Sequence, residues 1–472
     1  MSTASKEFLK QAAYKAPDLG HRAKLRWALD QAEIGFTRGK SRMDGRWESA
    51  RQRAYEVKWE AINHLDQYLL QFEEAVRSRG GHVYWATDGE DARRYIVNLA
   101  KQRNVQRIVK SKSMVSEEIH LAEALEHTGA DVLETDLGEY IVQLRKEPPY
   151  HIVTPAMHLS RTDIADLFRE KLGAGDDDTP ETLVAIARHT LRDGFVQADM
   201  GITGANFLVA DVGMAAITEN EGNARLSASL PKLHVVLTGI EKIIPKLEHL
   251  GLFWPMLATA GGGQSITAYN TLIGGPRQPG ETDGPEEFHV VLLDNGRSAL
   301  LADAEQRDVL HCIRCGACLN VCPIFLSVGG HTYGTTYPGP IGSVLTPHLR
   351  GLNDFGHLSF ASSLCGACTS VCPVKIDLHH HLLQNRRNAI QETHRPAGER
   401  IGFHVWRWFM QSERRYGRMG RMAQRLLRLF QSMQLENTPL DPLRPWTRYR
   451  TLPPAPQASF REWWQKNRGT QA

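Results

Sequence analysis

The chain has 472 residues, 42% hydrophobic and 23% charged, which suits a globular protein of two or three domains and excludes disorder over most of the sequence. Its 56 Lys+Arg and 53 Asp+Glu leave a formal net charge of +3, too balanced to predict nucleic acid as a partner. No apolar window of about 18 residues and no apolar run of signal-peptide length occurs, so neither a membrane span nor export is expected and a cytoplasmic protein is the default.

The first segment of the chain contains two predicted elements. Residues 1–45 are polar with little periodicity, and we expect an arm or a loosely packed helix that lies on the rest of the protein. Residues 48–79 are predicted to form one long amphipathic helix that ends at Gly80 and Gly81, because its apolar residues recur every three or four positions: Ile62, Leu65, Leu69, Phe72 and Val76.

From residue 46 to residue 297, short β-rich runs alternate with helical stretches. We interpret this rhythm as one α/β domain with an open, mostly parallel sheet, and we expect its boundary near residues 295–297. The predicted strands of this sheet are 82–86, 107–109, 130–133, 151–153, 214–218, 234–238 and 288–293.

All seven cysteines lie in a predicted smaller domain of residues 298–395. An odd number of cysteines without an export signal argues against a disulfide framework. The 42 residues between the two cysteine groups are longer than a compact bacterial ferredoxin allows, so an α-helical ferredoxin-like domain is predicted. The first group has the C-x2-C-x2-C-x3-C-P spacing with which bacterial ferredoxins hold iron–sulfur clusters, and it consists of Cys312, Cys315, Cys318 and Cys322.

The second cysteine group repeats this motif with one ligand missing, because Ser362 stands where the first cysteine would fall. In two-cluster ferredoxins the cysteine that precedes the proline ligates the other cluster. The two groups are therefore expected to exchange their last cysteines. This exchange predicts one cluster on Cys312, Cys315, Cys318 and Cys372, and another on Cys365, Cys368 and Cys322.

We therefore expect two iron–sulfur clusters as cofactors, and the first, with four thiolates, is predicted to be [4Fe–4S]. Three alternatives stay open for the second: a [3Fe–4S] cluster, a [4Fe–4S] cluster completed by an oxygen or nitrogen donor such as Ser362, or a cluster with one iron open to substrate. A pair of zinc sites is the competing interpretation, but the repeated spacing and the two Cys-Pro endings favour iron.

Residues 396–472 form a basic, aromatic and then Pro-rich tail. We predict a basic amphipathic helix followed, from about residue 439, by an extended segment. Trp406, Phe409 and Met410 are candidates to anchor a partner subunit or to lie on a membrane surface. The alternative is a helix that packs back over the first domain with solvated arginines.

From about residue 20 to residue 430 the sequence resembles the lactate-utilisation protein B family of iron–sulfur proteins. The likeness extends beyond the cysteines. It is carried by Lys-Ser-Lys-Ser-Met-Val-Ser-Glu-Glu at 110–118, Glu-Thr-Asp-Leu-Gly-Glu-Tyr at 134–140, Gly-Ile-Thr-Gly-Ala-Asn at 201–206, Asn-Glu-Gly-Asn at 220–223, Leu-Pro-Lys at 230–232, Ser-Leu-Cys-Gly-Ala-Cys at 363–368 and Val-Cys-Pro-Val-Lys at 371–375.

The resemblance implies a lactate-utilisation domain, similar in fold to sugar-phosphate isomerases and CoA transferases, joined to a ferredoxin-like module. It also implies an electron-transfer subunit of a complex that oxidises L-lactate to pyruvate, with two companions: a cysteine-rich iron–sulfur protein and a small lactate-utilisation-domain protein. The sequence departs from the family at 210–213, Ala-Asp-Val-Gly, where Glu and Thr are expected in the middle pair. This chain keeps an acidic residue there but lacks the hydroxyl group of the expected Thr, so a role for that hydroxyl is in doubt in this chain.

Oxidation of lactate removes two electrons and two protons, whereas iron–sulfur clusters carry electrons singly and accept no hydride. The sequence has no G-x-G-x-x-G motif after a predicted strand. A flavin or a companion subunit is therefore favoured over a bound NAD as the hydride acceptor.

Lys110, Lys112 and Ser113 follow a predicted strand and are candidates to hold a small carboxylate substrate, because open α/β sheets bind ligands at that edge. Backbone N–H groups and side-chain amides at 201–206 and 220–223 would form an anion-binding nest, to which Arg225 and Lys232 would add charge. Ordinary turns and surface lysines are the alternative. The candidates are Lys110, Lys112, Ser113, the segments 201–206 and 220–223, Arg225 and Lys232.

No catalytic residue is assigned from the sequence. Glu139 and Asp211 are candidate general bases, but a carboxylate that caps a loop explains either equally well. The run at 379–381, three histidines, is expected to lie on a helix surface, because consecutive helical residues point in different directions and do not easily share an ion.

Two other classes of function remain as alternatives. The first is a non-redox lyase or dehydratase whose open second cluster binds substrate as a Lewis acid. The second is a cluster-containing regulatory or scaffold protein that recruits partners through its Arg-rich tail.

Overall fold

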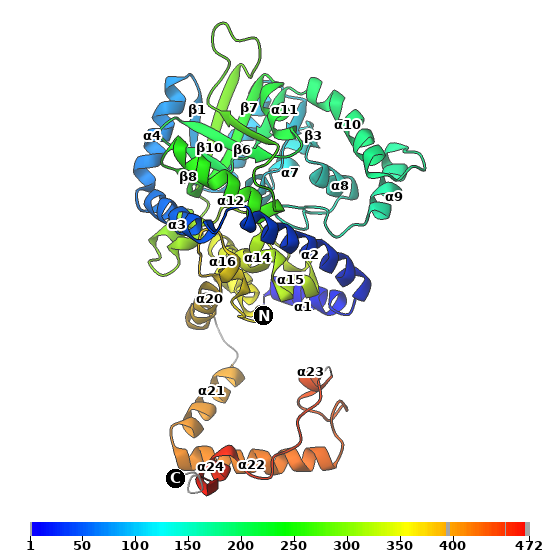
Figure 1. Ribbon diagram of the computed structural model, residues 1–472, viewed down its shortest axis with the longest axis vertical. Helices are drawn as coiled ribbons and strands as arrows, with labels where there is room; N and C mark the ends of the chain where they lie inside the picture. The colour runs from blue at the N-terminus through cyan, green and yellow to red at the C-terminus, as the bar shows by residue number, and fades with distance from the viewer. Residues whose placement is uncertain (1, 393–396, 449, 468–472) are drawn as a thin grey trace. The chain divides into compact units, whose positions relative to one another are not determined.

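The computed structural model describes residues 2–392, 397–448 and 450–467 (Figure 1). The chain divides into two compact units, Met1–Glu392 and Thr393–Ala472, here called unit 1 and unit 2. Unit 1 carries the α/β part and all seven cysteines, and every candidate site residue lies in it.

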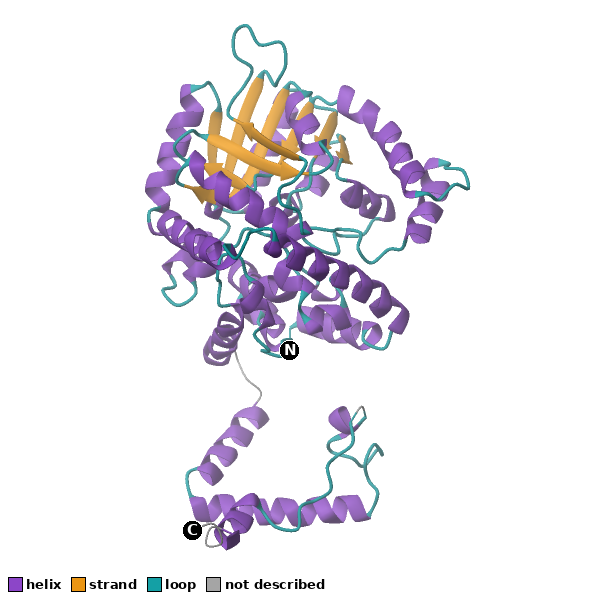
Figure 2. Ribbon diagram, viewed as in Figure 1, coloured by secondary structure: helices purple, strands orange, loops and turns teal. Residues whose placement is uncertain are grey.

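The centre of unit 1 is a six-stranded sheet in which every neighbouring pair is parallel (Figure 2). The strand order is β1-β10-β7-β4-β2-β3. This arrangement confirms the predicted α/β class with a mostly parallel sheet. The strands are β1 (His82–Ala86), β2 (Arg107–Lys110), β3 (Asp131–Glu134), β4 (Met200–Thr203), β7 (Leu233–Gly239) and β10 (Glu287–Leu293).

A second sheet of four strands has the order β8-β5-β6-β9, and it contains β5 (Phe207–Val209), β6 (Met214–Glu219), β8 (Ile243–Ile244) and β9 (Tyr269–Ile273). The prediction that residues 214–218 extend the main sheet is therefore wrong. A tight turn at Gly213, with φ 54°, reverses the chain so that β6 pairs antiparallel with β5. Residues 151–153 form no strand either, because the backbone N–H groups of Val153 and Thr154 donate to His151 Nδ1.

Both faces of the six-stranded sheet are buried, because successive residues of β7 and β10 enter different hydrophobic clusters. Val291 and Leu293 pack with helices α5 (Gly89–Gln102), α6 (Met114–Glu118) and α7 (Leu121–Glu126). Val290 and Leu292 pack with α4 (Leu65–Ser78) and with Leu208 of the second sheet. The other helices of the α/β part are α8 (Leu137–Arg145), α9 (Arg161–Leu172), α10 (Pro180–Val196), α11 (Asn223–Ser229) and α12 (Leu250–Gly262), with one-turn 3-10 segments η1 (Ile240–Lys242) and η2 (Leu247–His249).

Of the two alternatives for the N-terminal segment, an arm or a loosely packed helix, the structure shows helix, and one face of it is buried. The segment forms α1 (Thr3–Lys15) and α2 (Leu19–Ser41), and the side chains of Leu25, Leu29 and Phe36 are buried because they share one face of α2. The prediction of a single helix over 48–79 is wrong. The segment forms two helices, α3 (Trp47–Asn63) and α4, separated at His64, whose φ −122° and ψ 36° are not helical.

The cysteine-bearing part is built of short helices, as predicted for a helical ferredoxin-like domain. Its side chains share one hydrophobic core with α2, α12 and the second sheet. Its helices are α13 (Arg297–Ala302), α14 (Ala317–Asn320), α15 (Pro323–Val328), α16 (Gly339–Arg350), α17 (Leu352–Phe355), α18 (His357–Phe360), α19 (Ala367–Val371) and α20 (Leu378–Glu392), with 3-10 turns η3 (Arg307–His311) and η4 (His331–Tyr333).

Unit 2 consists of α21 (Ala397–Met410), α22 (Glu413–Ser432), α23 (Arg444–Thr447) and α24 (Phe460–Asn467). The Pro-rich segment lies along α22, because Arg428 and Gln431 donate hydrogen bonds to the carbonyls of Pro456 and Pro453. Among the residues that the structure describes, no helix is long and apolar enough to cross a membrane.

Candidate cluster sites and the adjoining pocket

The structure brings four cysteines together around one small apolar cavity. They are the first three of the first group and the last of the second: Cys312, Cys315, Cys318 and Cys372. Ile152, Ile313 and Ile341 line the same cavity. Burial and, to a smaller extent, the neighbouring Cys312 raise the pKa of the Cys372 thiol to about 12. The cysteine before Pro373 therefore lies with the first group, across the domain from its own motif.

The remaining three cysteines form a second group. Burial, followed by the nearby Cys322 and Cys365, raises the pKa of the Cys368 thiol to about 11. The pKa of Cys322 is likewise raised by burial and by Cys365. Cys365 itself is exposed, whereas Cys368 is buried. This second group thus reaches the surface of the protein.

The two cysteine motifs share one backbone conformation. Arg314 and Leu364 have positive φ angles of 60° and 53°, and Gly316 and Gly366 follow with 77° and 80°. In the first motif the N–H of Arg314 donates to Cys312 Sγ at 3.4 Å, and in the second the N–H of Leu364 donates to the hydroxyl oxygen of Ser362 at 3.2 Å. Ser362 therefore occupies the position that Cys312 has in the first motif.

The chemistry of these two groups fits iron–sulfur ligation. Backbone amides approach the sulfurs of Cys322 and Cys372, with N–H donors from Phe325 at 3.5 Å and from Ile376 at 3.3 Å. Such amide donors stabilise thiolate sulfur and tune the reduction potential of a cluster. The apolar surroundings and the repeated loop geometry supply what a buried cluster requires, except for a fourth thiolate in the second group.

A pocket of about 390 Å³ lies at the carboxyl edge of the six-stranded sheet, beside the first cysteine group. Arg314 and Cys315 form part of its wall, and the segments that follow β2 and β4 form another part. This is the edge at which open parallel sheets bind ligands. The pocket brings together most of the predicted polar candidates, namely Lys112, Ser113, Gly204, Ala205, Asn206, Asn220, Glu221 and Asn223.

Lys242 is the functional candidate that the sequence did not indicate. Its side chain lines the pocket and the residue is only 5% exposed, yet its ammonium group has no hydrogen-bond or ion-pair partner among the described residues. Burial, together with the nearby Arg314 guanidinium, lowers the pKa of Lys242 to about 8. By contrast Lys112 is already paired, since its Nζ lies 3.0 Å from Asp136 Oδ2 and donates to the carbonyl of Val153.

Three predicted cations do not reach the pocket. Lys110 is fully buried and its ammonium contacts Glu134 at 2.7 Å and Glu117 at 3.0 Å. Arg225 and Lys232 are exposed and do not line the pocket. Lys110, the last residue of β2, is therefore held in the interior by its two carboxylate partners, whereas Lys112, beyond the strand, reaches the pocket.

The two candidate bases also lie outside the pocket wall. Glu139 is buried beside Glu134 and Lys110, and burial followed by the Glu134 carboxylate raises its pKa well above the ordinary value. Asp211 accepts hydrogen bonds from the N–H of Leu247. Asp211 therefore caps a loop, which was the alternative to a general base.

A buried ionic network joins the sheet to the first cysteine loop, and the sequence did not indicate it. Arg297 contacts Glu118 at 2.8 Å and Glu241 at 2.7 Å, and Arg314 contacts the other oxygen of Glu241 at 3.3 Å. Tyr337 donates to Glu118 at 2.6 Å. The network fixes the loop that carries Cys312 and Cys315 against the α/β part.

Two of the three histidines at 379–381 lie side by side and contact the same carboxylate, contrary to the prediction. The rings of His379 and His380 stack with centroids 4.3 Å apart, and both contact Asp377. The expectation of divergent directions was wrong for this pair because they lie in the first turn of α20, where Asp377 draws both rings to one side. His381 points inward and lies 2.9 Å from Asp308.

Three family models match the chain in succession. They are the LUD domain over residues 69–293, the 4Fe-4S dicluster domain over 308–376, and the C-terminal region of lactate utilisation protein B over 379–469. The dicluster match spans all seven cysteines. A crystal structure of a DUF162 family protein from Deinococcus radiodurans aligns with 48% of this chain and 98% of its own, at 14% identity and a TM-score of 0.27.

Curated relatives match over nearly the whole length. Lactate utilization protein B 2 of Bacillus mycoides (strain KBAB4) and lactate utilization protein B of Bacillus thuringiensis (strain Al Hakam) are each 44% identical over 425 residues, which cover 90% of this chain and 89% of theirs. With this identity and coverage, and with the three domain matches in order, the chain belongs to the lactate utilization protein B family.

Proposed function

We propose that this chain is the iron–sulfur electron-transfer subunit of a cytoplasmic complex that oxidises L-lactate to pyruvate. Its partners would be two companion lactate-utilisation proteins, one cysteine-rich and one with a small lactate-utilisation domain. The observation that carries the proposal is the shared wall of the pocket, where Cys315 and Arg314 face the polar edge of the sheet. A small carboxylate bound there would lie beside the first cluster.

Two clusters would serve this role. Cys312, Cys315, Cys318 and Cys372 would hold a [4Fe–4S] cluster, which supplies a one-electron carrier when bound. Cys322, Cys365 and Cys368 would hold the second, either [3Fe–4S] or a [4Fe–4S] cluster completed by a non-cysteine donor. The position of Ser362 in the repeated loop supports its hydroxyl as that donor.

The positions of the two groups support a direction for electron flow. The first group is mostly buried and borders the pocket, whereas the second reaches the surface at Cys365. Electrons would enter the first cluster from the pocket side and leave from the second to a companion protein. The hydride acceptor would lie in a companion or in a flavin, because clusters accept electrons singly.

Within the pocket, this chain's own residues would bind and orient the substrate. Lys242 is the one pocket cation among the described residues whose ammonium group has no partner, so it would pair with the substrate carboxylate. Ser113 and Asn206 supply hydroxyl and amide groups for a substrate hydroxyl. The charges of Lys112 and Arg314 are already committed to Asp136 and Glu241.

The test uses the anaerobically reconstituted holoprotein and follows the electron paramagnetic resonance (EPR) of both clusters as L-lactate is added. We expect Lys242→Gln to weaken binding of L-lactate about 10- to 100-fold, which corresponds to the free energy of one charge-assisted hydrogen bond. Lys246→Gln is the matched control, because its side chain is 63% exposed and does not line the pocket. Equal binding of L-lactate by both variants would show that Lys242 does not contact the substrate.

The same titration separates the competing functions. Perturbation of the four-cysteine cluster signal supports a substrate in the adjoining pocket. Perturbation confined to the three-cysteine cluster would instead favour the lyase or dehydratase alternative, in which an open iron binds the hydroxy acid. A reconstituted protein without iron, sulfide and reducible visible absorbance would contradict any role in electron transfer.

A further inference from the structure

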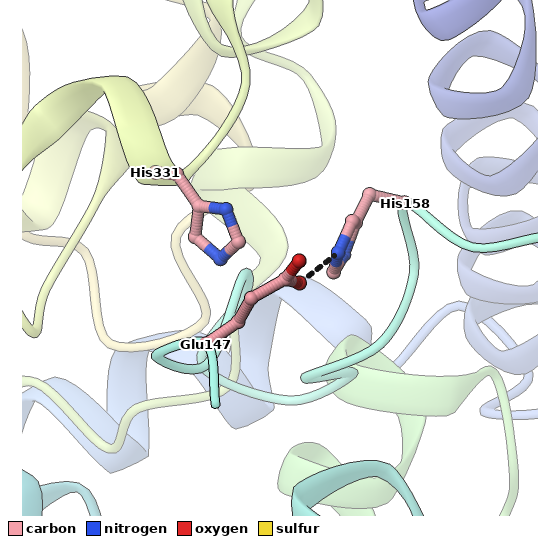
Figure 3. Close-up of side chains that lie close together, drawn as sticks. All are labelled: Glu147, His158 and His331. Carbon is pink, nitrogen blue, oxygen red and sulfur yellow. Dashed lines mark hydrogen bonds and ion pairs between the residues drawn. The ribbon is translucent and has the colours of Figure 1, made fainter. Parts of the chain in front are cut away.

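A cluster of one carboxylate and two imidazoles lies outside the pocket wall and outside the lining of the four-cysteine cavity. Figure 3 shows Glu147, His158 and His331 with their polar ends turned toward one another. Glu147 follows α8, His158 precedes α9, and His331 begins η4, in the segment between the two cysteine groups. The tertiary fold thus brings His331, distant in the sequence, beside Glu147 and His158.

The spacing of these side chains suits one metal ion. One potential ligand atom from each of the three residues lies within 4.8 Å of the other two. His158 Nε2 and Glu147 Oε2 are 3.0 Å apart, and the centroids of the two imidazole rings are 5.0 Å apart at an interplanar angle of 67°. Metal–ligand bonds of about 2.0–2.2 Å to nitrogen and oxygen need donor atoms at such separations, with a small inward movement of the most distant pair.

The surrounding contacts hold the three side chains as outer-shell groups hold metal ligands. Arg145 donates to Glu147 Oε1 at 2.7 Å, which leaves Oε2 toward the imidazoles. His331 donates from Nε2 to the carbonyl of Pro148 at 2.8 Å, so its Nδ1 keeps the lone pair. The ring of Tyr150 stacks on His158 at 4.4 Å. Hydrogen bonds to a carbonyl or to the second carboxylate oxygen are the contacts that orient metal ligands.

The protonation states are also those that a cation needs. Burial lowers the pKa of His158 to about 4, and it lowers the pKa of His331 as well, so both rings are neutral at pH 7. Burial opposes ionisation of Glu147, but hydrogen bonds from Arg145 and His158 outweigh it and lower the pKa of the carboxyl group. A neutral imidazole and an ionised carboxylate are the forms that coordinate a metal.

We propose that Glu147, His158 and His331 bind one divalent first-row transition ion, with zinc as the best fit. One carboxylate oxygen and one nitrogen of each ring would be the ligands, and water would take the remaining position. This mononuclear site is separate from the iron–sulfur clusters and does not depend on the proposed function.

The site has a structural consequence for the protein. Residues 147–158 belong to the α/β part, and His331 belongs to the insert between the cysteine groups. Ile152, which lies between Glu147 and His158, lines both the pocket and the four-cysteine cavity. An ion held at this point would clamp the 147–158 segment to the cluster insert and so hold the wall that the pocket and the cavity share.

The test measures zinc in the anaerobically reconstituted holoprotein after dialysis against a weak chelator, by mass spectrometry of the metal, with iron and sulfide measured in the same sample. We expect about one zinc per chain, with an X-ray absorption spectrum of nitrogen and oxygen neighbours at about 2.0–2.1 Å and no sulfur shell at about 2.3 Å. Zinc binding should also raise the melting temperature.

The variants decide where the ion binds. Glu147→Gln and His331→Ala should each lose the zinc while keeping wild-type iron and sulfide, which shows that the protein is folded. His380→Ala is the matched control. His380 belongs to a second group of one carboxylate and two imidazoles, formed by Asp377, His379 and His380. The proposal is overturned if no zinc is retained, if the spectrum shows sulfur ligands, or if zinc is lost in His380→Ala but kept in Glu147→Gln.

Discussion

Cys372 has the most informative position of any single residue in this chain, because its thiol lies with Cys312, Cys315 and Cys318 rather than with its own motif. We therefore predict that Cys372→Ser damages the four-cysteine cluster and leaves the other intact. Low-temperature EPR of the reduced variant, compared with Cys312→Ser, checks the prediction, and the two variants should lose the same signal.

Cys322→Ser is the reciprocal change. It should remove the signal that Cys365→Ser removes, because the three-cysteine site has no spare thiolate. If Cys372→Ser lost the Cys365-dependent signal and kept the Cys312-dependent one, each motif would hold its own cluster and the exchanged arrangement would be wrong.

Ser362 offers a gain-of-ligand prediction. Its hydroxyl stands where Cys312 stands in the first motif, so Ser362→Cys should supply the missing thiolate. If the second cluster is [3Fe–4S], iron in the reconstituted protein should rise from about seven to about eight atoms per chain, and the oxidised [3Fe–4S] EPR signal should disappear. If it is a serine-ligated [4Fe–4S] cluster, iron stays at about eight and the reduction potential shifts. An unchanged potential with unchanged iron would contradict a ligand position for residue 362.

Glu139 gives a prediction for the pH dependence of stability. Its pKa in the folded protein lies well above the ordinary 4.5, because burial and then the Glu134 carboxylate disfavour its charge. The folded state keeps a proton that the unfolded chain releases. The stabilisation is therefore complete below about pH 4.5 and is lost as the pH rises toward the raised pKa, by at most about 1.4 kcal/mol per pH unit.

Glu139→Gln removes that titration, because the amide cannot ionise. As the pH rises above about 4.5, the melting temperature of the variant should fall less steeply than that of the wild type. Glu126→Gln, on an exposed position of α7, is the control and should follow the wild-type curve. Parallel curves for wild type and Glu139→Gln would show that Glu139 is not a protonated acid in the folded state.

Among the pocket residues, the sequence predicted those that directly follow a strand and missed those that arrive from elsewhere. Lys112 and Ser113 were predicted because the carboxyl edge of a parallel sheet is a known ligand position, and Asn206 because its segment resembles an anion-binding nest. Lys242 and Arg314 could not be predicted this way. Lys242 lies in a 3-10 turn after β7, and Arg314 lies in the cluster loop, so only the tertiary fold brings them to the pocket.

At the scale of elements, hydrophobic periodicity predicted most strands of the parallel sheet, but it did not separate the second sheet from the first or show where one helix ends and the next begins. The alternation of strands and helices predicted β1, β2, β3, β7 and β10, because buried parallel strands read as short apolar runs. The second sheet was missed, since a hairpin strand such as β6 has the same composition as a strand of the main sheet. The break at His64 was missed because the apolar stripe continues through it from α3 to α4.

Helix α22 carries an unusual surface that gives a prediction for binding. Its exposed apolar side chains Met422, Leu426, Leu429 and Met433 recur at four, three and four residues and so share one face. The helix also contains six arginines and a single acidic residue. A basic amphipathic helix of this kind binds anionic membrane surfaces.

We therefore expect the full-length protein to sediment with vesicles that contain anionic lipid. Replacing Arg418 and Arg425 by Gln should weaken this binding roughly 30-fold, since each basic residue contributes about 1 kcal/mol near such a surface. Replacing Arg107 and Arg103 in unit 1 by Gln is the charge-matched control and should have little effect. If the wild-type protein did not bind the vesicles, a companion subunit would be the better candidate for this face.

At the scale of the whole molecule, the α/β part and the cysteine-bearing part form one body. Phe207 and Phe253 of the α/β part share a hydrophobic cluster with Ile313, Leu319 and Phe325 of the cluster part. The buried network around Arg297 and Glu241 crosses the same junction. The pocket and the first cysteine group, which share Ile152 and Cys315 in their walls, are therefore held in fixed positions relative to one another.

The measurement that tests the central claim most directly is rapid-freeze EPR of this holoprotein mixed with its two companion proteins and L-lactate under anaerobic conditions. The account predicts that both cluster signals of this chain become reduced as pyruvate forms. It also predicts that Cys315→Ser, which disables the cluster beside the pocket, reduces pyruvate formation to background. Pyruvate formed at the wild-type rate by the Cys315→Ser mixture, or formed while the clusters of this chain stay oxidised, would contradict the account.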